Sequence, residues 1–159
     1  MLRIAPLGAF KNGFDLLDES DRLVAVFRGS VWREGGQITA GPERYQFRRD
    51  GRRRFRLDGA VGTVAAAWRP SVWSSGWEIE IGSLRYELAR AGWFARAWQL
   101  RSGRRMLGRV VPRRGSTRRA VADLPAELPP PITAFLVAVV LTLWRRDEAA
   151  AAAAASGSS

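Results

Sequence analysis

Hydrophobic and polar positions alternate in short segments over most of this chain, from Leu23 to about Asp123. Turn-forming residues interrupt the pattern roughly every 8 to 12 residues, which is typical of an all-β protein. No segment of this region has the 3.6-residue period of an amphipathic helix. Two segments before it, Leu2–Pro6 and Phe14–Asp18, are candidates for one or two further strands. The strands predicted within the region are Leu23–Arg33, Gln37–Ala40, Arg44–Arg49, Arg53–Asp58, Gly62–Trp68, Gly76–Ile81, Leu84–Arg90, Trp93–Leu100, Arg105–Val111 and Arg118–Ala122.

The segment WEIEIGSLRYEL predicts an antiparallel hairpin with one buried face. Its Gly82-Ser83 pair suits a two-residue turn. Apolar residues then meet apolar residues on one face only, as a half-buried hairpin requires. The predicted register pairs Trp77 with Leu88, Ile79 with Tyr86 and Ile81 with Leu84 on that face, and Glu78 with Glu87 and Glu80 with Arg85 on the other.

The arginine-rich segment RYQFRRDGRRRFRLD predicts a second hairpin. A two-residue turn would place apolar residues on both faces, whereas a three-residue turn keeps them on one face. We therefore expect the three-residue turn. The expected register turns at Asp50-Gly51-Arg52, pairs Phe47 with Phe55 and Tyr45 with Leu57, and places Arg44, Arg48, Arg54 and Arg56 on the outer face. A third hairpin is expected to turn at Ser102-Gly103.

Near its C-terminus the chain contains a segment of different character, Ile132–Trp144, with no charged residue. Pro131 suits the first position of a helix, and a helix that is apolar all round must be buried on every side. It would span about 20 Å, against about 30 Å of hydrocarbon in a bilayer. The length favours a buried helix over about 131–146, and a C-terminal membrane anchor is the alternative. The residues expected in the core are Ile132, Phe135, Leu136, Val139, Val140 and Leu143.

The order of these elements, ten to twelve strands before PPPITAFLVAVVLTLWRR, resembles the tubby-like superfamily, especially the LURP-one-related proteins and phospholipid scramblases. The resemblance covers about Leu2 to Arg146. It implies a mainly β fold, a closed antiparallel barrel of about twelve strands around one central hydrophobic C-terminal helix. A barrel has no sheet edges, and a wide one needs its interior filled, which an all-round apolar helix does. No functional residue of the family matches this sequence, so the resemblance predicts architecture and not lipid scrambling.

Composition limits the chemistry that the chain can perform. Its 159 residues predict a single domain over 1–148, with 149–159 as a low-complexity disordered tail. The absence of Cys and His removes thiolate and imidazole chemistry, and no glycine-rich nucleotide motif occurs. We therefore expect no enzyme, metal or cofactor. The N-terminus lacks the apolar core of a signal peptide, so a cytoplasmic protein, peripheral at the membrane, is expected.

Positive charge is the main functional signal. The chain has 26 Lys and Arg against 15 Asp and Glu, a net charge of +11, which attracts polyanions. Arginine binds phosphate bidentately, so an anionic phospholipid or membrane surface is the expected partner, with nucleic acid as the alternative. A solvated basic face without a ligand remains open as well. The candidate anion-binding residues form two clusters, Arg44, Arg48, Arg54 and Arg56, and Arg113, Arg114, Arg118 and Arg119.

Aromatic and acidic residues suggest further sites. Nucleic-acid stacking needs exposed aromatic rings among the cations, and the second hairpin turns its phenylalanines inward, which favours lipid over nucleic acid. Trp68 and Trp73 bracket a turn, where they either cover a barrel mouth or meet a membrane interface. The carboxylates of Glu78, Glu80 and Glu87 lie near one another in the expected register. They suit either a hard cation such as Ca²⁺ or an ion-pair patch with the neighbouring arginine.

Overall fold

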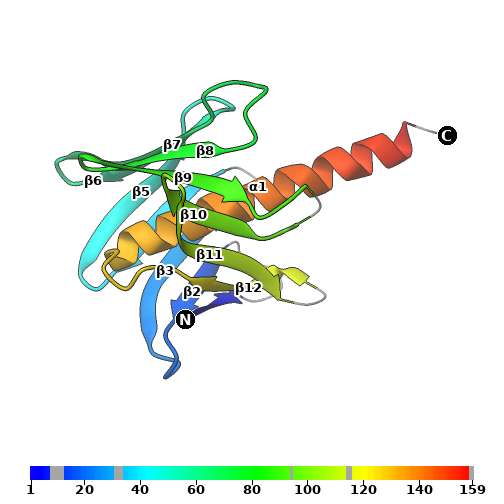
Figure 1. The fold of residues 1–159 in the computed structure, drawn as a ribbon. Coiled ribbons are helices and arrows are strands. Elements are labelled where there is room, and N and C mark those ends of the chain that lie inside the picture. The colour runs from blue at the N-terminus through cyan, green and yellow to red at the C-terminus, as the bar shows by residue number, and fades with distance from the viewer. Residues whose placement is uncertain (8–12, 31–33, 94, 114–115, 158–159) are drawn as a thin grey trace.

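The computed structural model describes residues 1–7, 13–30, 34–93, 95–113 and 116–157, without the side chains of residues 30 and 116–119. Twelve strands and one helix form in these residues (Figure 1). The strands are β1 (Leu2–Pro6), β2 (Gly13–Leu17), β3 (Leu23–Ser30), β4 (Gly35–Ala40), β5 (Glu43–Arg49), β6 (Arg54–Gly59), β7 (Gly62–Trp68), β8 (Trp77–Ile81), β9 (Leu84–Arg90), β10 (Trp98–Ser102), β11 (Arg105–Arg113) and β12 (Ser116–Asp123), and the helix is α1 (Pro130–Ser156).

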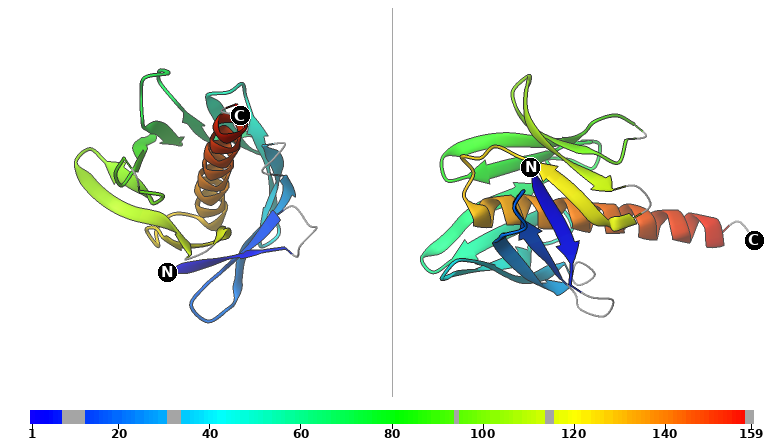
Figure 2. Two further views of the ribbon diagram at one scale, coloured as in Figure 1. Left: turned by 90° about the vertical axis from the view of Figure 1, so that its right-hand side faces the viewer. Right: turned by 90° about the horizontal axis from the view of Figure 1, so that it is seen from below.

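The strands close into an antiparallel barrel around α1. Each strand pairs with its neighbours in the chain, and β1 pairs with β12 to close the sheet. Seen along the barrel in Figure 2, left, the strands surround the helix. This confirms the predicted fold, a closed barrel of about twelve strands around a hydrophobic C-terminal helix.

The two ends of the barrel differ in their connections. Antiparallel neighbours send successive connections to alternate ends. We call one end the turn end, because it carries the short connections such as Gly41-Pro42 and Gly82-Ser83. The other, the loop end, carries longer connections, including residues 69–76 between β7 and β8 and residues 91–97 between β9 and β10. The helix enters at the turn end and leaves at the loop end (Figure 2, right).

Two of the three predicted hairpin turns need correction. The β8–β9 register agrees with the prediction at all five pairs. In the β5–β6 hairpin, Phe47 pairs with Leu57 rather than with Phe55, and the Asp50 amide donates to the Arg54 carbonyl at 2.8 Å. The turn is therefore 51–53, and the shift of two residues keeps both faces as predicted. In β10–β11, Ser102 pairs with Arg105, so Gly103 and Arg104 form the turn.

The predicted bounds of the strands differ from the observed bounds mainly beside the longer loops. β10 begins at Trp98 and not at Trp93, and a hydrogen bond from the Ala91 amide to the Ala97 carbonyl at 2.9 Å closes the connection before it. β3 reaches Ser30, and the predicted remainder to Arg33 lies outside the described residues.

The core forms between the inner wall and α1. Every residue from Pro131 to Trp144 is buried, including all six predicted core residues. The helix is apolar all round because the barrel surrounds it. The Phe47 ring lies 5.9 Å from the Phe135 ring in an edge contact, and a row of aromatic rings continues along the wall through Phe14, Phe27, Phe47, Phe55 and Trp77.

The helix continues beyond the barrel. The sequence predicts disorder after Glu148, but α1 extends to Ser156, and its residues from Asp147 onward are exposed. Alanine has the highest helix propensity, and the buried part of the helix has already overcome the cost of nucleation. Among the described ranges, no helix is both long and apolar enough to cross a membrane.

Candidate functional site at the loop end of the barrel

The predicted arginine face of the β5–β6 hairpin is a network of mixed charge. Its four arginines point outward as predicted. Asp58 lies 3.1 Å from Arg56 Nε and 3.6 Å from Arg48 Nε, and Asp50 lies 3.9 Å from Arg54 Nε. Three of the four positive charges are therefore partly neutralised by their own hairpin, which weakens this face as an anion site.

The second arginine cluster lies on the opposite wall. Arg113 is exposed at the end of β11, Arg114 lies outside the described residues, and the side chains of Arg118 and Arg119 in β12 are not described. Four strands, β7–β10 in one direction and β1–β4 in the other, separate the β5–β6 hairpin from β11–β12. The two clusters therefore do not form one surface on the barrel wall.

The three predicted carboxylates lie on the outer wall of β8 and β9. Glu80 forms an ion pair with Arg85 at 3.4 Å, and the Arg85 guanidinium lies 5.7 Å from the centre of the Trp68 ring. In the described part of the chain, no three acidic residues are close enough to hold a metal ion. The ion-pair interpretation therefore fits this patch better than a cation site.

A buried carboxylate at the loop end holds the emerging helix. Glu34, between β3 and β4, has a backbone φ of +53°, and its side chain is 10% exposed. Arg146 of α1 donates to Glu34 through Nε at 2.6 Å and Nη2 at 2.9 Å, and donates to the Arg52 carbonyl at 2.7 Å. Arg49 donates to the same carboxylate at 2.9 Å. The Arg146 guanidinium also lies 5.0 Å from the Phe55 ring centre, so this node joins the helix to two loops.

The Glu34 carboxyl gives the protein a component of acid sensitivity. Burial by itself raises its pKa, but hydrogen bonds and charges from Arg146 and Arg49 outweigh burial, and the net pKa lies below the ordinary value. A carboxyl group whose pKa is lower in the folded state than in the unfolded state stabilises the folded state. This contribution is complete at pH values above the unfolded-state pKa, about 4.3, and disappears as the pH falls through the folded-state pKa.

We therefore expect the wild-type free energy of unfolding to fall below about pH 4, and to fall less steeply in Glu34→Gln. Urea unfolding between pH 2 and 7 measures this dependence. Glu127→Gln removes an exposed carboxyl and is the control, which should retain the wild-type slope. An unchanged acid slope in Glu34→Gln would show that this node does not govern the response.

A second set of contacts ties the other side of the helix to the β9–β10 loop. Arg90 forms an ion pair with Asp147 at 2.5 Å, and its guanidinium lies 5.3 Å from the Trp98 ring centre. The Trp144 indole donates to the Arg96 carbonyl at 2.7 Å. Helix α1 is therefore held at the loop end from two opposite directions.

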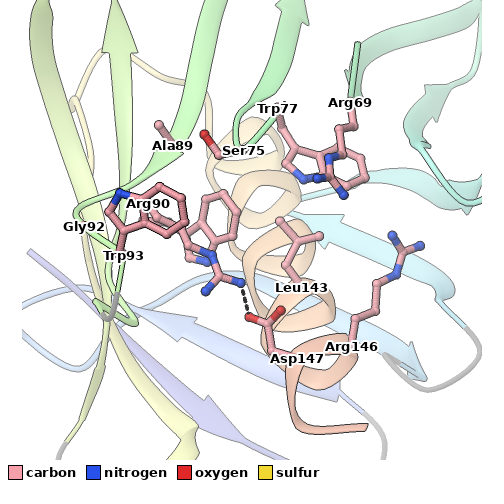
Figure 3. A pocket seen from close by; sticks show the side chains of 11 residues that line it. Arg69, Ser75, Trp77, Ala89, Arg90, Gly92, Trp93, Leu143, Arg146 and Asp147 are labelled. Carbon is pink, nitrogen blue, oxygen red and sulfur yellow. Dashed lines mark hydrogen bonds and ion pairs between the residues drawn. The ribbon is translucent and has the colours of Figure 1, made fainter. Parts of the chain in front are cut away.

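Between these two sets of contacts lies a pocket of about 520 Å³. Figure 3 shows Arg90 and Trp93 on one side of Leu143, and Trp77 and Arg69 on the other. Asp147 reaches toward Arg90 from the helix. The pocket therefore combines aromatic walls with charged groups. Its lining residues are Arg69, Ser75, Trp77, Ala89, Arg90, Gly92, Trp93, Trp98, Leu143, Arg146 and Asp147.

Arg69 organises the β7–β8 loop beside the pocket. Its Nε donates to the Ser74 carbonyl at 2.5 Å, and its Nη2 donates to the Val72 carbonyl at 2.8 Å. Both acceptors are neutral, and no described carboxylate lies within ion-pair distance of Arg69. The positive charge of Arg69 therefore remains uncompensated.

Two tryptophans project from the loop end into solvent. Trp73 in the β7–β8 loop is 92% exposed, and Trp93 in the β9–β10 loop is 96% exposed. Of the two roles expected for Trp68 and Trp73, covering the barrel mouth is wrong. Trp68 lies on the outer wall beside Arg85, and residues at the end of the buried part of the helix, such as Trp144, close the mouth instead.

Exposed arginines accompany these two tryptophans. Arg52 and Arg53 lie in the β5–β6 turn, and Arg96 lies in the β9–β10 loop. Their side chains have no carboxylate of the described chain within ion-pair distance. We call Trp73, Trp93, Arg52, Arg53 and Arg96 together the rim.

Comparison with models of protein families, with curated proteins and with solved structures yielded no match to this chain. The candidate site therefore rests on the geometry of the loop end.

The sequence indicates Trp73 as a candidate but does not indicate most of the other residues at the loop end. One signal in the sequence indicates that Trp93 lies in a loop, because it follows Gly92 in a turn-like segment. The alternating pattern instead places Trp93 in a strand. Glu34 and Arg146 are 112 residues apart, and no local pattern indicates their contact.

Proposed function

We propose that this protein is a non-catalytic module that docks on an anionic membrane surface through the rim. The observation that carries the proposal is the nearly complete exposure of Trp73 and Trp93 on two loops at one end of the barrel. Tryptophan is favoured at the membrane–water interface, so two exposed tryptophans at one end of the barrel suit docking on a lipid surface.

The charge of the rim supports the anionic character of that surface. Arg52, Arg53 and Arg96 are exposed and lack carboxylate partners within the described residues. A basic residue close to an anionic leaflet contributes about 1 kcal/mol. The outer β5–β6 face contributes less than its sequence suggests, because Asp50 and Asp58 partly neutralise it. The proposed docking surface is therefore the rim and not that wall.

We also propose that the chain is a tubby-like barrel. Support comes from the order of its elements, twelve strands followed by one helix that fills their interior. The likeness concerns architecture, and lipid scrambling is not part of the proposal.

The double variant Trp73→Ala/Trp93→Ala is expected to weaken binding to anionic vesicles at least about tenfold, which corresponds to about 1.4 kcal/mol. Both side chains are almost fully exposed, so the free energy of unfolding should stay within about 0.5 kcal/mol of wild type. Co-sedimentation with vesicles containing phosphatidylserine, and with neutral vesicles, measures the effect.

Val61→Ala is the matched control, because Val61 is fully exposed at the turn end. Its binding should equal that of the wild type. Equal binding of wild-type protein to anionic and neutral vesicles at low salt would contradict the membrane proposal.

Nucleic-acid binding by the same rim is the second candidate. Trp73 and Trp93 supply the exposed rings that the β5–β6 hairpin lacks, and base stacking on such rings contributes about 1–3 kcal/mol per base. This candidate predicts a salt-dependent mobility shift of a single-stranded oligonucleotide that the double variant loses. Vesicle binding that is insensitive to the double substitution, together with that shift, would favour nucleic acid.

A further inference from the structure

The pocket beside the emerging helix has a net positive charge. Among the described residues, its lining includes Arg69, Arg90 and Arg146 against one carboxylate, that of Asp147. Arg146 is paired with Glu34, yet Arg49 shares the same carboxylate, so this pairing does not remove the excess. Within the described part of the chain, Arg69 donates its hydrogen bonds to neutral carbonyls. The pocket therefore favours an anion.

The remaining walls favour an apolar or aromatic group. Trp77 is 4% exposed and Trp98 is 3% exposed, so both are fixed within the barrel. Leu143 of α1 lies between the two sides in Figure 3. A volume of about 520 Å³ is that of an ordinary small-molecule site, and an inorganic ion would fill little of it.

We propose that this pocket binds a small organic anion, a phosphate or carboxylate group attached to an apolar or aromatic body. The anionic group binds Arg90, whose guanidinium can donate two parallel hydrogen bonds, and Arg69 adds positive charge from the other side of the pocket. The body lies against Trp77, Trp98 and Leu143. Asp147 competes with the ligand for Arg90, because its carboxylate already accepts from that guanidinium at 2.5 Å.

The test uses octyl phosphate at monomeric concentrations, followed by tryptophan fluorescence and calorimetry on the full chain. Octanol has the same body without the anion, and inorganic phosphate has the anion without the body. We expect octyl phosphate to bind at least tenfold more tightly than either. Comparable binding of octanol or of inorganic phosphate would overturn the proposal.

Two substitutions on one ion pair make the test specific. Asp147→Asn removes the competing carboxylate and should tighten octyl phosphate binding at least threefold, whereas Arg90→Gln should weaken it at least fivefold. A role of this pair in structure alone would shift the octyl phosphate affinity of both variants in the same direction.

Asp50→Asn is the control for net charge. It changes the net charge as much as Asp147→Asn does, but on the outer wall and outside the pocket, so it should have no effect on octyl phosphate binding. Equal tightening in Asp50→Asn and Asp147→Asn would overturn the assignment to this pocket.

Trp93 belongs both to the rim and to the pocket lining, but the inference is tested separately from membrane docking, because Arg90 and Asp147 are not rim residues. The same anionic group could reach the pocket in free solution or as a lipid headgroup. Vesicles containing phosphatidic acid distinguish these sources. Release of the protein from them by octyl phosphate indicates the headgroup, and simultaneous binding of both indicates a water-borne ligand. Either result supports the pocket, provided that Asp147→Asn tightens octyl phosphate binding.

Discussion

A chain that ends at Leu128 is expected to show no cooperative unfolding transition. The deletion removes α1, whose residues from Pro131 to Trp144 are all buried. The inward residues of the strands, such as Phe47 and Leu57, would then line a void. Protein interiors are close-packed, and an unfilled apolar interior forfeits the contacts that stabilise it. Circular dichroism and urea unfolding measure the outcome.

A second truncation provides the matched control for this deletion. A chain that ends at Glu148 lacks only the exposed alanine-rich end of α1. It retains Arg146 and Asp147, which hold the helix at the loop end. It should unfold at the wild-type urea concentration. If the chain that ends at Leu128 kept β-type dichroism and a cooperative transition, the helix would not be the core of the barrel.

Phe135→Ala is expected to destabilise the folded state strongly, by about 3–5 kcal/mol. Phe135 is fully buried in the part of the helix that the barrel surrounds, and its ring contacts Phe47 on the wall. Its removal leaves a cavity that neither a closed barrel nor a straight helix can readily fill. Urea unfolding at pH 7 gives the change in the free energy of unfolding.

Leu84→Ala is the control for the Phe135 substitution. Leu84 is also a large apolar residue, but it is 58% exposed at the turn end. Its replacement should change the free energy of unfolding by less than about 0.5 kcal/mol. A loss below about 1 kcal/mol in Phe135→Ala would contradict tight packing between the helix and the wall.

The fold was largely predictable because its pattern is local. Alternation in each strand and the uniformly apolar segment at Ile132–Trp144 indicate a barrel that must be filled. The register of the β5–β6 hairpin was less determined. A shift of two residues leaves Phe47 and Phe55 on the same inner face, so the hydrophobic pattern does not distinguish the two registers.

The candidate site was predicted poorly because it depends on contacts distant in sequence. Arg90 and Asp147 are 57 residues apart, and they meet only because the helix leaves the barrel beside the β9–β10 loop. Clusters of arginine in the sequence were a weak indicator, because Asp50, between β5 and β6, and Asp58 in β6 form ion pairs with them. Net charge alone does not show which cations are already paired.

The most direct test of membrane docking is a comparison of the two ends of the barrel on vesicles. Because the chain has no cysteine, Val72→Cys, next to Trp73 in the β7–β8 loop, and Val61→Cys each carry one polarity-sensitive fluorophore, at exposed positions on opposite ends. On anionic vesicles the label at position 72 should shift its emission to the blue, while the label at position 61 should not change. Equal shifts at both positions, or a shift at position 61 alone, would contradict docking through the rim.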